Sequence, residues 1–165
     1  MRPLRVCEAM TRAPRVCHPD QTLHDCARVM AQHDVGALPV YENEVLVGMI
    51  TDRDLAVRGV AVRREHDTPV REVMTTKVLC CTEDQELDQV AARMAEARVR
   101  RVPVLNGDGR LVGILSLSDV ALKHDPATAA LTVWAISKPG APHSQAGHDA
   151  GVTDASTKHV TDRRS

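Results

Sequence analysis

Two stretches with nearly the same pattern decide the fold: Leu46-Val-Gly-Met-Ile-Thr-Asp-Arg-Asp54 and Leu111-Val-Gly-Ile-Leu-Ser-Leu-Ser-Asp119. In each stretch, an apolar run that contains a glycine is followed by a hydroxyl residue and, three positions later, by an aspartate. The apolar run predicts a buried strand, and the hydroxyl residue predicts the start of a helix with the aspartate in its first turn. Each stretch therefore predicts a strand that leads directly into a helix.

The pairing of a hydroxyl residue with an aspartate has two interpretations. A helix start offers free N–H groups to an anion, and a carboxylate offers two acceptor oxygens to a vicinal diol, so the pair fits a nucleotide. Thr51 with Asp54, and Ser116 with Asp119, also fit a capping box with Asp in place of Glu. One isolated copy favours capping. Two copies in matched contexts shift the balance toward binding, because they indicate a repeated architecture.

The whole chain is an internal repeat with an offset of about 64 positions. One residue is inserted in the second copy near Asn106-Gly-Asp-Gly109, where a hairpin turn is expected. Because the matching segments occur in the same order in both halves, the chain contains a duplicated unit. The matching segments are Val6–Thr11 with Val70–Thr75, Asp20–Leu23 with Asp84–Leu87, Pro39 with Pro103, and Gly48 with Gly113.

Each repeat predicts the order strand, helix, strand, strand, helix, which is an α+β fold. Asp20 and Asp84 are the expected N-caps of the first helices, whose apolar stripes predict a buried face. The second helices are expected at 52–58, with Gly59 as the stop, and at 117–124. The stripes consist of Leu23, Cys26, Ala27, Met30 and Ala31 in the first repeat and of Leu87, Val90, Ala91, Met94 and Ala95 in the second.

Composition excludes several classes of protein. The formal net charge is −1, so no broad surface attracts nucleic acid or an anionic membrane. No apolar run is long enough to span a bilayer and the N-terminus lacks a signal-peptide core, so we expect a cytoplasmic protein. Five cysteines without CxxC spacing predict reduced thiols in an apolar interior. With one Tyr, one Trp and no Phe, aromatic stacking on nucleic acid bases is nearly excluded.

The predicted organisation is a first repeat at 1–59, a linker at 60–69, a second repeat at 70–124, a helix at 125–137 and a disordered tail at 138–165. Asp125-Pro126 is the expected cap of the C-terminal helix, and Trp134 is expected to dock that helix on the core. The tail contains His143, His148 and His159 without a fixed scaffold, so we expect no metal site.

These marks together resemble a tandem pair of CBS domains, the repeat named after cystathionine β-synthase. The resemblance covers about residues 4–124 and is closest to small stand-alone bacterial proteins of this family. It implies two repeats packed around a pseudo-twofold axis, with two clefts for ligands. The motifs that carry it are Met-Thr in the leading segment of each repeat, Gly36-Ala-Leu-Pro-Val40, Arg100-Arg-Val-Pro-Val104, and the two strand-to-helix stretches.

The resemblance also implies roles for individual residues in binding an adenosine-containing ligand. Asp54 and Asp119 would hold ribose, Thr51 and Ser116 would face phosphate, and Arg100 with Arg101 would contact phosphate. Asp52 places a negative charge at the first helix start, and Arg53 offsets it, so the second cleft is the expected anion site. The residues that would flank the bases are Val16, Cys17, Cys80 and Cys81.

Two classes of function follow. The first is a regulatory module that binds AMP, ADP or ATP and acts as a homodimer through a shift between two arrangements. The second is a ligand-free interaction or stress-response scaffold that acts through a protein partner. No nucleophile is paired with a base and no Gly-rich phosphate loop is present, so we expect neither catalytic residues nor a required cofactor.

Overall fold

The computed structural model describes residues 2–123 and 126–138, and it confirms the α+β arrangement of two repeats. The first repeat contains α1 (Val6–Ala9), β1 (Thr11–Arg12), α2 (Leu23–His33), β2 (Ala37–Glu42), β3 (Val45–Thr51), α3 (Asp52–Asp54), a π-helical turn η1 (Leu55–Gly59) and a 3₁₀ turn η2 (Val60–Val62). The second contains the 3₁₀ turn η3 (Val70–Glu72), β4 (Cys81–Thr82), α4 (Leu87–Ala97), β5 (Arg101–Leu105), β6 (Leu111–Ser116) and α5 (Leu117–Lys123). Helix α6 (Pro126–Ser137) follows.

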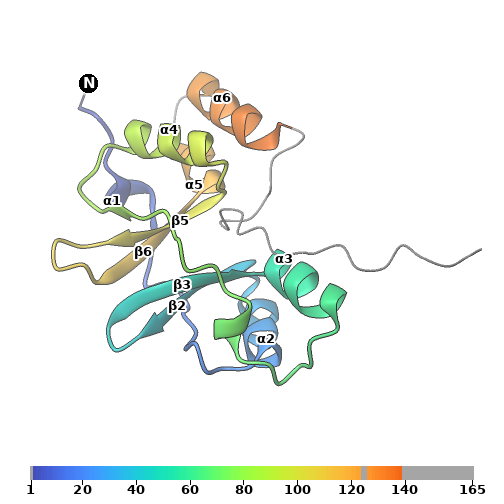
Figure 1. Cartoon of the computed structure of the whole chain (residues 1–165). Helices are drawn as coiled ribbons and strands as arrows, with labels where there is room; N and C mark the ends of the chain where they lie inside the picture. The colour runs from blue at the N-terminus through green and yellow to red at the C-terminus, as the bar shows by residue number, and fades with distance from the viewer. Residues whose placement is uncertain (1, 124–125, 139–165) are drawn as a thin grey trace, which may run out of the picture.

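The two repeats build sheets of the same layout. The sheet that the second repeat builds has the strand order β1-β6-β5-β4, in which β1 comes from the leading segment of the first repeat. In this sheet β4 is parallel to β5 and the other pairs are antiparallel. In the first repeat the hairpin β2-β3 is extended by two isolated bridges, a parallel one from Cys17 to Val40 and an antiparallel one from Met49 to Thr75. The two halves of the molecule lie one above the other in Figure 1.

The leading segments are exchanged between the repeats. Val6, Ala9 and Met10 pack in the core of the second repeat, and Val70 and Val73 pack in the core of the first. Figure 1 shows α1 beside α4, in the half that the second repeat builds. The units that pack together are therefore not contiguous in the sequence.

Two glycines admit these exchanged segments. A Cβ on Gly48 would lie 2.8 Å from the Thr75 carbonyl oxygen and 2.8 Å from Met74 Sδ. A Cβ on Gly113 would lie 3.0 Å from the Thr11 carbonyl oxygen and 2.5 Å from Met10 Sδ. Because contacts below 3.0 Å force neighbouring atoms to shift, the glycine in each strand-to-helix stretch permits the other repeat's Met-Thr backbone to pair with the hairpin.

The apolar stripes of α2 and α4 face these cores, with three exceptions to the predicted pattern. Leu23, Cys26 and Met30 are buried, whereas Ala27 and Ala31 are exposed. In α4 the predicted set is buried except for Ala95, which is half-buried.

Both predicted N-caps of the first helices are wrong. Thr22 is the N-cap of α2 and accepts from the Asp25 N–H at 3.0 Å, and Glu86 occupies the equivalent position before α4. Asp20 is instead bound by Arg71, and Asp84 accepts from the Thr82 hydroxyl.

Two further predictions fail at helix ends. Gly59 does not stop the second helix, since the chain continues through η1 and η2 to Arg63, which takes the left-handed conformation (φ 59°). Trp134 does not dock α6, because its side chain is 62% exposed. The buried face of α6 is formed by Ala129, Thr132 and Ile136, and Trp134 lies on the opposite side of the helix.

Some expectations fall on residues that the structure does not describe: the end of the second helix at His124, the cap at Asp125 and the tail from residue 139. In the described part of the chain, no helix combines the length and apolarity needed to cross a bilayer.

The cysteines are unbridged, and three of them are core residues. Cys17, Cys26 and Cys81 are buried, whereas Cys7 and Cys80 are half-buried. Burial raises the pKa of the Cys81 thiol to about 12, so little thiolate forms there near neutral pH.

We expect Gly48→Ala to lower the free energy of unfolding by about 1–3 kcal/mol, because the Thr75 backbone cannot move away without losing its pairing with Met49. Gly107→Ala is the matched control, since a Cβ there meets nothing within 4 Å, and it should change stability by less than about 0.5 kcal/mol. Urea unfolding of both variants measures the difference. Equal stability of the two variants would contradict the close-approach explanation.

We also expect a thiol reagent to titrate five cysteines after unfolding under non-reducing conditions. At pH 8, Cys81 should react slowly in the folded protein, because its raised pKa and its burial both limit attack by the thiolate. Mass spectrometry after brief alkylation identifies which thiols react. Rapid labelling of Cys81, or fewer than five titratable thiols, would show that this arrangement is incorrect.

Candidate functional site

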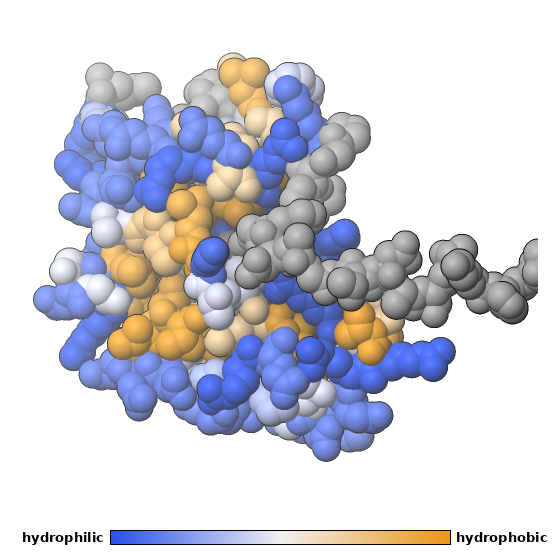
Figure 2. Space-filling view, in the orientation of Figure 1, coloured by the Kyte–Doolittle hydropathy of each residue, from blue (hydrophilic) through white to orange (hydrophobic). Residues whose placement is uncertain are grey.

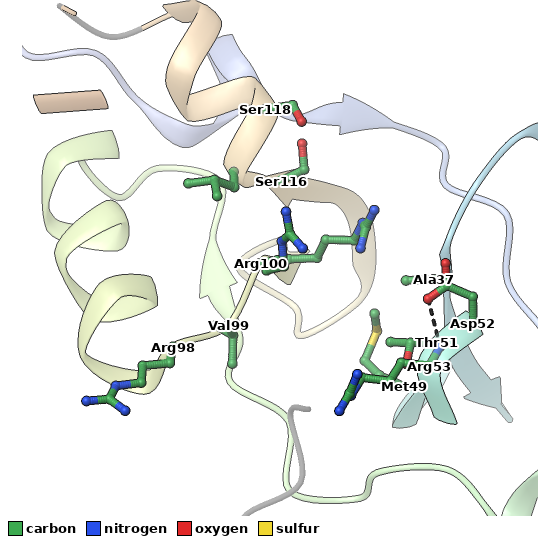
Figure 3. A pocket seen from close by; sticks show the side chains of 12 residues that line it. Ala37, Met49, Thr51, Asp52, Arg53, Arg98, Val99, Arg100, Ser116 and Ser118 are labelled. Carbon is green, nitrogen blue, oxygen red and sulfur yellow. Dashed lines mark hydrogen bonds between the residues drawn. The ribbon is translucent and has the colours of Figure 1, made fainter. Parts of the chain in front are cut away.

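A polar cavity of about 470 Å³ lies between the two repeats (Figure 3). The first repeat contributes the start of β2, part of β3 and the start of α3, and the second contributes the loop after α4 and the junction of β6 with α5. Both strand-to-helix stretches therefore reach the same cavity. The lining residues are Ala37, Met49, Thr51, Asp52, Arg53, Arg98, Val99, Arg100, Arg101, Ser116, Leu117 and Ser118.

The capping-box interpretation is correct for both hydroxyl–aspartate pairs. Asp54 Oδ2 accepts from the Thr51 hydroxyl at 2.8 Å and from the Thr51 N–H at 3.0 Å, and the Asp54 N–H donates back to Thr51 Oγ1 at 3.1 Å. Ser116 and Asp119 make the same three bonds at 2.7, 2.7 and 3.2 Å. Each aspartate thus uses one carboxylate oxygen to fix the helix start.

The two aspartates differ in what surrounds the second carboxylate oxygen. The Asp54 side chain is only 4% exposed, and its Oδ1 lies 3.8 Å from Arg58 Nε. Arg58 also donates to the Val73 carbonyl oxygen at 3.1 Å, which ties it to the leading segment of the second repeat. Asp119 is half-buried and forms no ion pair with another described residue. The Asp119 carboxylate is therefore less enclosed than that of Asp54.

Charge in the cavity is mainly positive. The lining residues include Arg53, Arg98, Arg100 and Arg101 but only one carboxylate, that of Asp52. The Arg98 side chain points away from the other lining residues (Figure 3). Asp52 Oδ2 and Arg101 Nη2 lie 2.8 and 3.5 Å from the point that a Cβ on Gly36 would occupy. Asp52 and Arg101 therefore lie close together beside Gly36, and Arg100 lines the same cavity, so the expectation that Asp52 and the arginine pair belong to separate clefts is wrong.

Five of the predicted site residues line this cavity, and six do not. Asp54 and Asp119 lie behind the helix starts that they cap. Cys17 and Cys81 are core residues. Of their neighbours, Val16 is 43% exposed and Cys80 is half-buried. The five that line the cavity are Thr51, Arg53, Arg100, Arg101 and Ser116.

Sequence reasoning missed several lining residues, among them Ser118 and Arg98. The position of Ser118 inside the second strand-to-helix stretch was a usable signal. For the apolar lining residues the sequence holds no such signal, because they also fit a simple core role.

Beyond the cavity, Figure 2 shows apolar side chains gathered across the junction of the two halves, with hydrophilic residues on either side.

Comparison with known proteins agrees with this architecture. The family model of the CBS domain matches residues 6–59 and 70–123. The CBS domain-containing protein YhcV of Bacillus subtilis is 40% identical over 128 residues, which cover 76% of this chain and 91% of YhcV.

Two solved structures show the same fold. The crystal structure of Hypoxic Response Protein I with two coordinated zinc ions superposes with a TM-score of 0.67 at 30% identity, covering 74% of this chain and 100% of that chain. The crystal structure of CBSX2 in complex with AMP superposes with a TM-score of 0.62 at 27% identity, covering 79% and 98%. With two matched repeats and a shared arrangement, the chain belongs to the CBS domain family, as a tandem pair.

Proposed function

We propose that this chain is a regulatory module that binds an adenosine nucleotide such as AMP, ADP or ATP between its repeats. The observation that carries the proposal is the cavity into which two capped helix starts and three arginines converge. Guanidinium groups favour phosphate, and Arg53, Arg100 and Arg101 all line the cavity. A regulatory role, without catalysis, is consistent with the similarity to YhcV, which is itself described only as a CBS domain-containing protein.

The phosphates would lie in the cavity beside Arg100 and Arg101, with Thr51, Arg53 and Ser116 at its walls. The ribose diol would bind the second oxygen of Asp119, since Asp119 Oδ2 already accepts two bonds from Ser116. Asp54 is the weaker ribose candidate because Arg58 and burial close it off. The base would extend toward the apolar surface at the junction of the two halves (Figure 2). Among the residues predicted to flank a base, Val16 and Cys80 are the two that are not buried.

The CBSX2 structure supports the ligand class, because it is a complex with AMP. That protein and this chain share the fold over most of both chains.

We expect Asp119→Ala to weaken nucleotide binding by about ten- to hundredfold, the loss of a hydrogen bond to a charged group. Asp54→Ala is the matched control, because it destroys the same type of capping box at a carboxylate that is only 4% exposed. Its affinity should stay within a few-fold of the unsubstituted protein. Titration calorimetry with AMP, ADP, ATP and adenosine measures all three proteins.

A second pair of variants tests the arginines. Arg100→Gln with Arg101→Gln should weaken ATP much more than adenosine, and the difference should shrink as salt rises. Arg98→Gln is the control, since that side chain points away from the cavity (Figure 3). If no adenosine compound binds the unsubstituted protein, the helix starts serve only as capping boxes and the scaffold function replaces the sensor.

We also propose that the chain forms a homodimer through its outer helices. Large apolar side chains are exposed there: Val60 is 78% exposed after η1, Leu122 is 82% exposed on α5, and Trp134 is 62% exposed on α6. A second copy would remove these side chains from water, which favours association. The dimer would also provide the two arrangements between which a ligand could shift the population.

Sedimentation velocity at micromolar concentration should show a dimer, and Val60→Glu with Leu122→Glu should convert it to monomer. Val45→Glu is the control, since Val45 is 57% exposed at the tip of the β2-β3 hairpin. A monomer without any substitution, or equal effects of both changes, would contradict the proposed surface. Because affinity for nucleotide is measured separately, this outcome leaves the proposed ligand site unaffected.

A further inference from the structure

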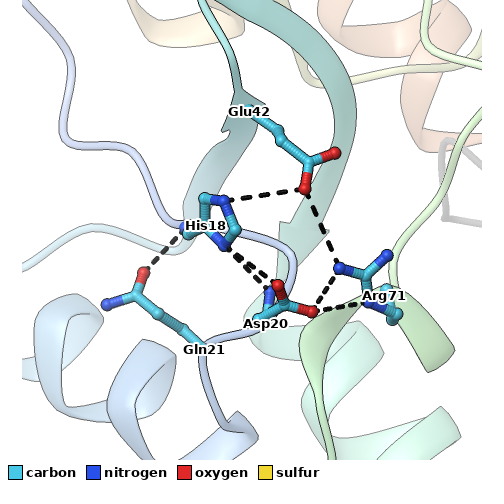
Figure 4. Close-up of polar contacts among 5 residues, drawn as sticks. All are labelled: His18, Asp20, Gln21, Glu42 and Arg71. Carbon is cyan, nitrogen blue, oxygen red and sulfur yellow. Dashed lines mark hydrogen bonds and ion pairs between the residues drawn. The ribbon is translucent and has the colours of Figure 1, made fainter.

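Four side chains at the end of β2, none of which lines the cavity, form a closed ring (Figure 4). His18 Nδ1 lies 3.7 Å from Asp20 Oδ2, and His18 Nε2 lies 3.6 Å from Glu42 Oε1. Arg71 completes the ring: its Nε donates to Asp20 Oδ1 at 2.8 Å, and its Nη2 lies 3.9 Å from Glu42 Oε1. The two carboxylates thus alternate with the imidazole and the guanidinium.

The backbone holds this ring in place from three directions. The His18 N–H donates to Gln21 Oε1 at 2.7 Å, which fixes the turn that carries His18 and Asp20. The Tyr41 N–H donates to the Cys17 carbonyl oxygen at 2.8 Å, which sets the end of β2 beside that turn. The Arg71 N–H donates to the Pro19 carbonyl oxygen at 3.0 Å. The side chains are therefore positioned by main-chain bonds and not only by their own attraction.

Three members of the ring are side chains of the types that ligate metals. One ligand atom from each of His18, Asp20 and Glu42 can be chosen so that all three lie within 4.8 Å of one another. Bonds of about 2.0–2.2 Å to one zinc ion require these atoms to draw together from that spacing. One imidazole with two carboxylates suits a first-row divalent ion, and the exposure of His18 and Asp20 leaves room for solvent ligands.

The second repeat has the same backbone without this chemistry. The positions of His18, Asp20 and Glu42 are occupied there by Thr82, Asp84 and Asn106. Asp84 accepts from the Thr82 hydroxyl, and both repeats fold alike. The fold therefore does not require a histidine and two carboxylates at this place.

We propose that His18, Asp20 and Glu42 bind a divalent transition-metal ion such as Zn²⁺, in competition with Arg71 for the two carboxylates. This site is separate from the nucleotide cavity and departs from the prediction that the chain has no metal site. Binding draws the carboxylates away from Arg71, which belongs to η3, the leading segment of the second repeat.

Calorimetry with Zn²⁺ on the full chain, and absorption spectra with Co²⁺, test the proposal. His18→Gln and Glu42→Gln should each weaken binding by at least about tenfold. The controls are His33→Gln, an exposed histidine at the end of α2, and Asp84→Asn, the counterpart of Asp20, and both should bind as the unsubstituted chain does. The Co²⁺ spectrum should lack the thiolate charge-transfer band, which excludes the cysteines as ligands.

Arg71→Gln separates a metal site from a simple ion-pair cluster. Removal of the competing cation should tighten Zn²⁺ binding about fivefold or more, whereas loss of a merely structural contact would not raise affinity. Circular dichroism checks that each variant is folded. Zinc binding that persists unchanged in His18→Gln, or that weakens in Arg71→Gln, would overturn the proposal.

Discussion

The close approach of each Met-Thr backbone to a glycine in the opposite hairpin is the constraint on which the structure depends. At Gly48 the partner is the Thr75 carbonyl oxygen, and at Gly113 it is that of Thr11. Only where no Cβ intervenes can the backbone of one repeat join the sheet of the other. That pairing completes both cores, and it brings the two helix starts to one cavity between the halves.

Much of the architecture could be predicted because it rests on local patterns that occur twice. The repeat, the hairpins and the helix starts all follow from apolar periodicity and turn residues. The exchange of the leading segments between the repeats could not be predicted. The repeat shows that Val6 and Val70 are equivalent positions, but this equivalence is the same whichever of the two cores each residue joins. The prediction that Trp134 docks the C-terminal helix was wrong because it rested on the size of one side chain. The buried face of α6 is formed instead by smaller residues such as Ala129 and Ile136.

The candidate site was predicted in part, and the errors have a common physical origin. Thr51 and Ser116 could be singled out from the sequence, because a helix start is a local feature, and both line the cavity together with Arg100 and Arg101. The separation into a first cleft with Asp52 and a second with Arg101 was wrong, since the Arg101 side chain crosses the junction to Gly36, beside which Asp52 also lies. Capping by itself does not exclude ligand binding, because a carboxylate that caps through one oxygen still has a second.

The exchange of leading segments also fixes the order in which the chain can mature on the ribosome. Val6 emerges first, yet the core that it joins extends to Ile136, so this core is complete only when nearly the whole described chain has been synthesised. The core around Ile50 needs only Val70 and Val73, which emerge soon after it. The first half can therefore consolidate early, while α1 stays unpaired until synthesis is almost complete, which makes the N-terminal segment the last to gain protection from proteases and chaperones.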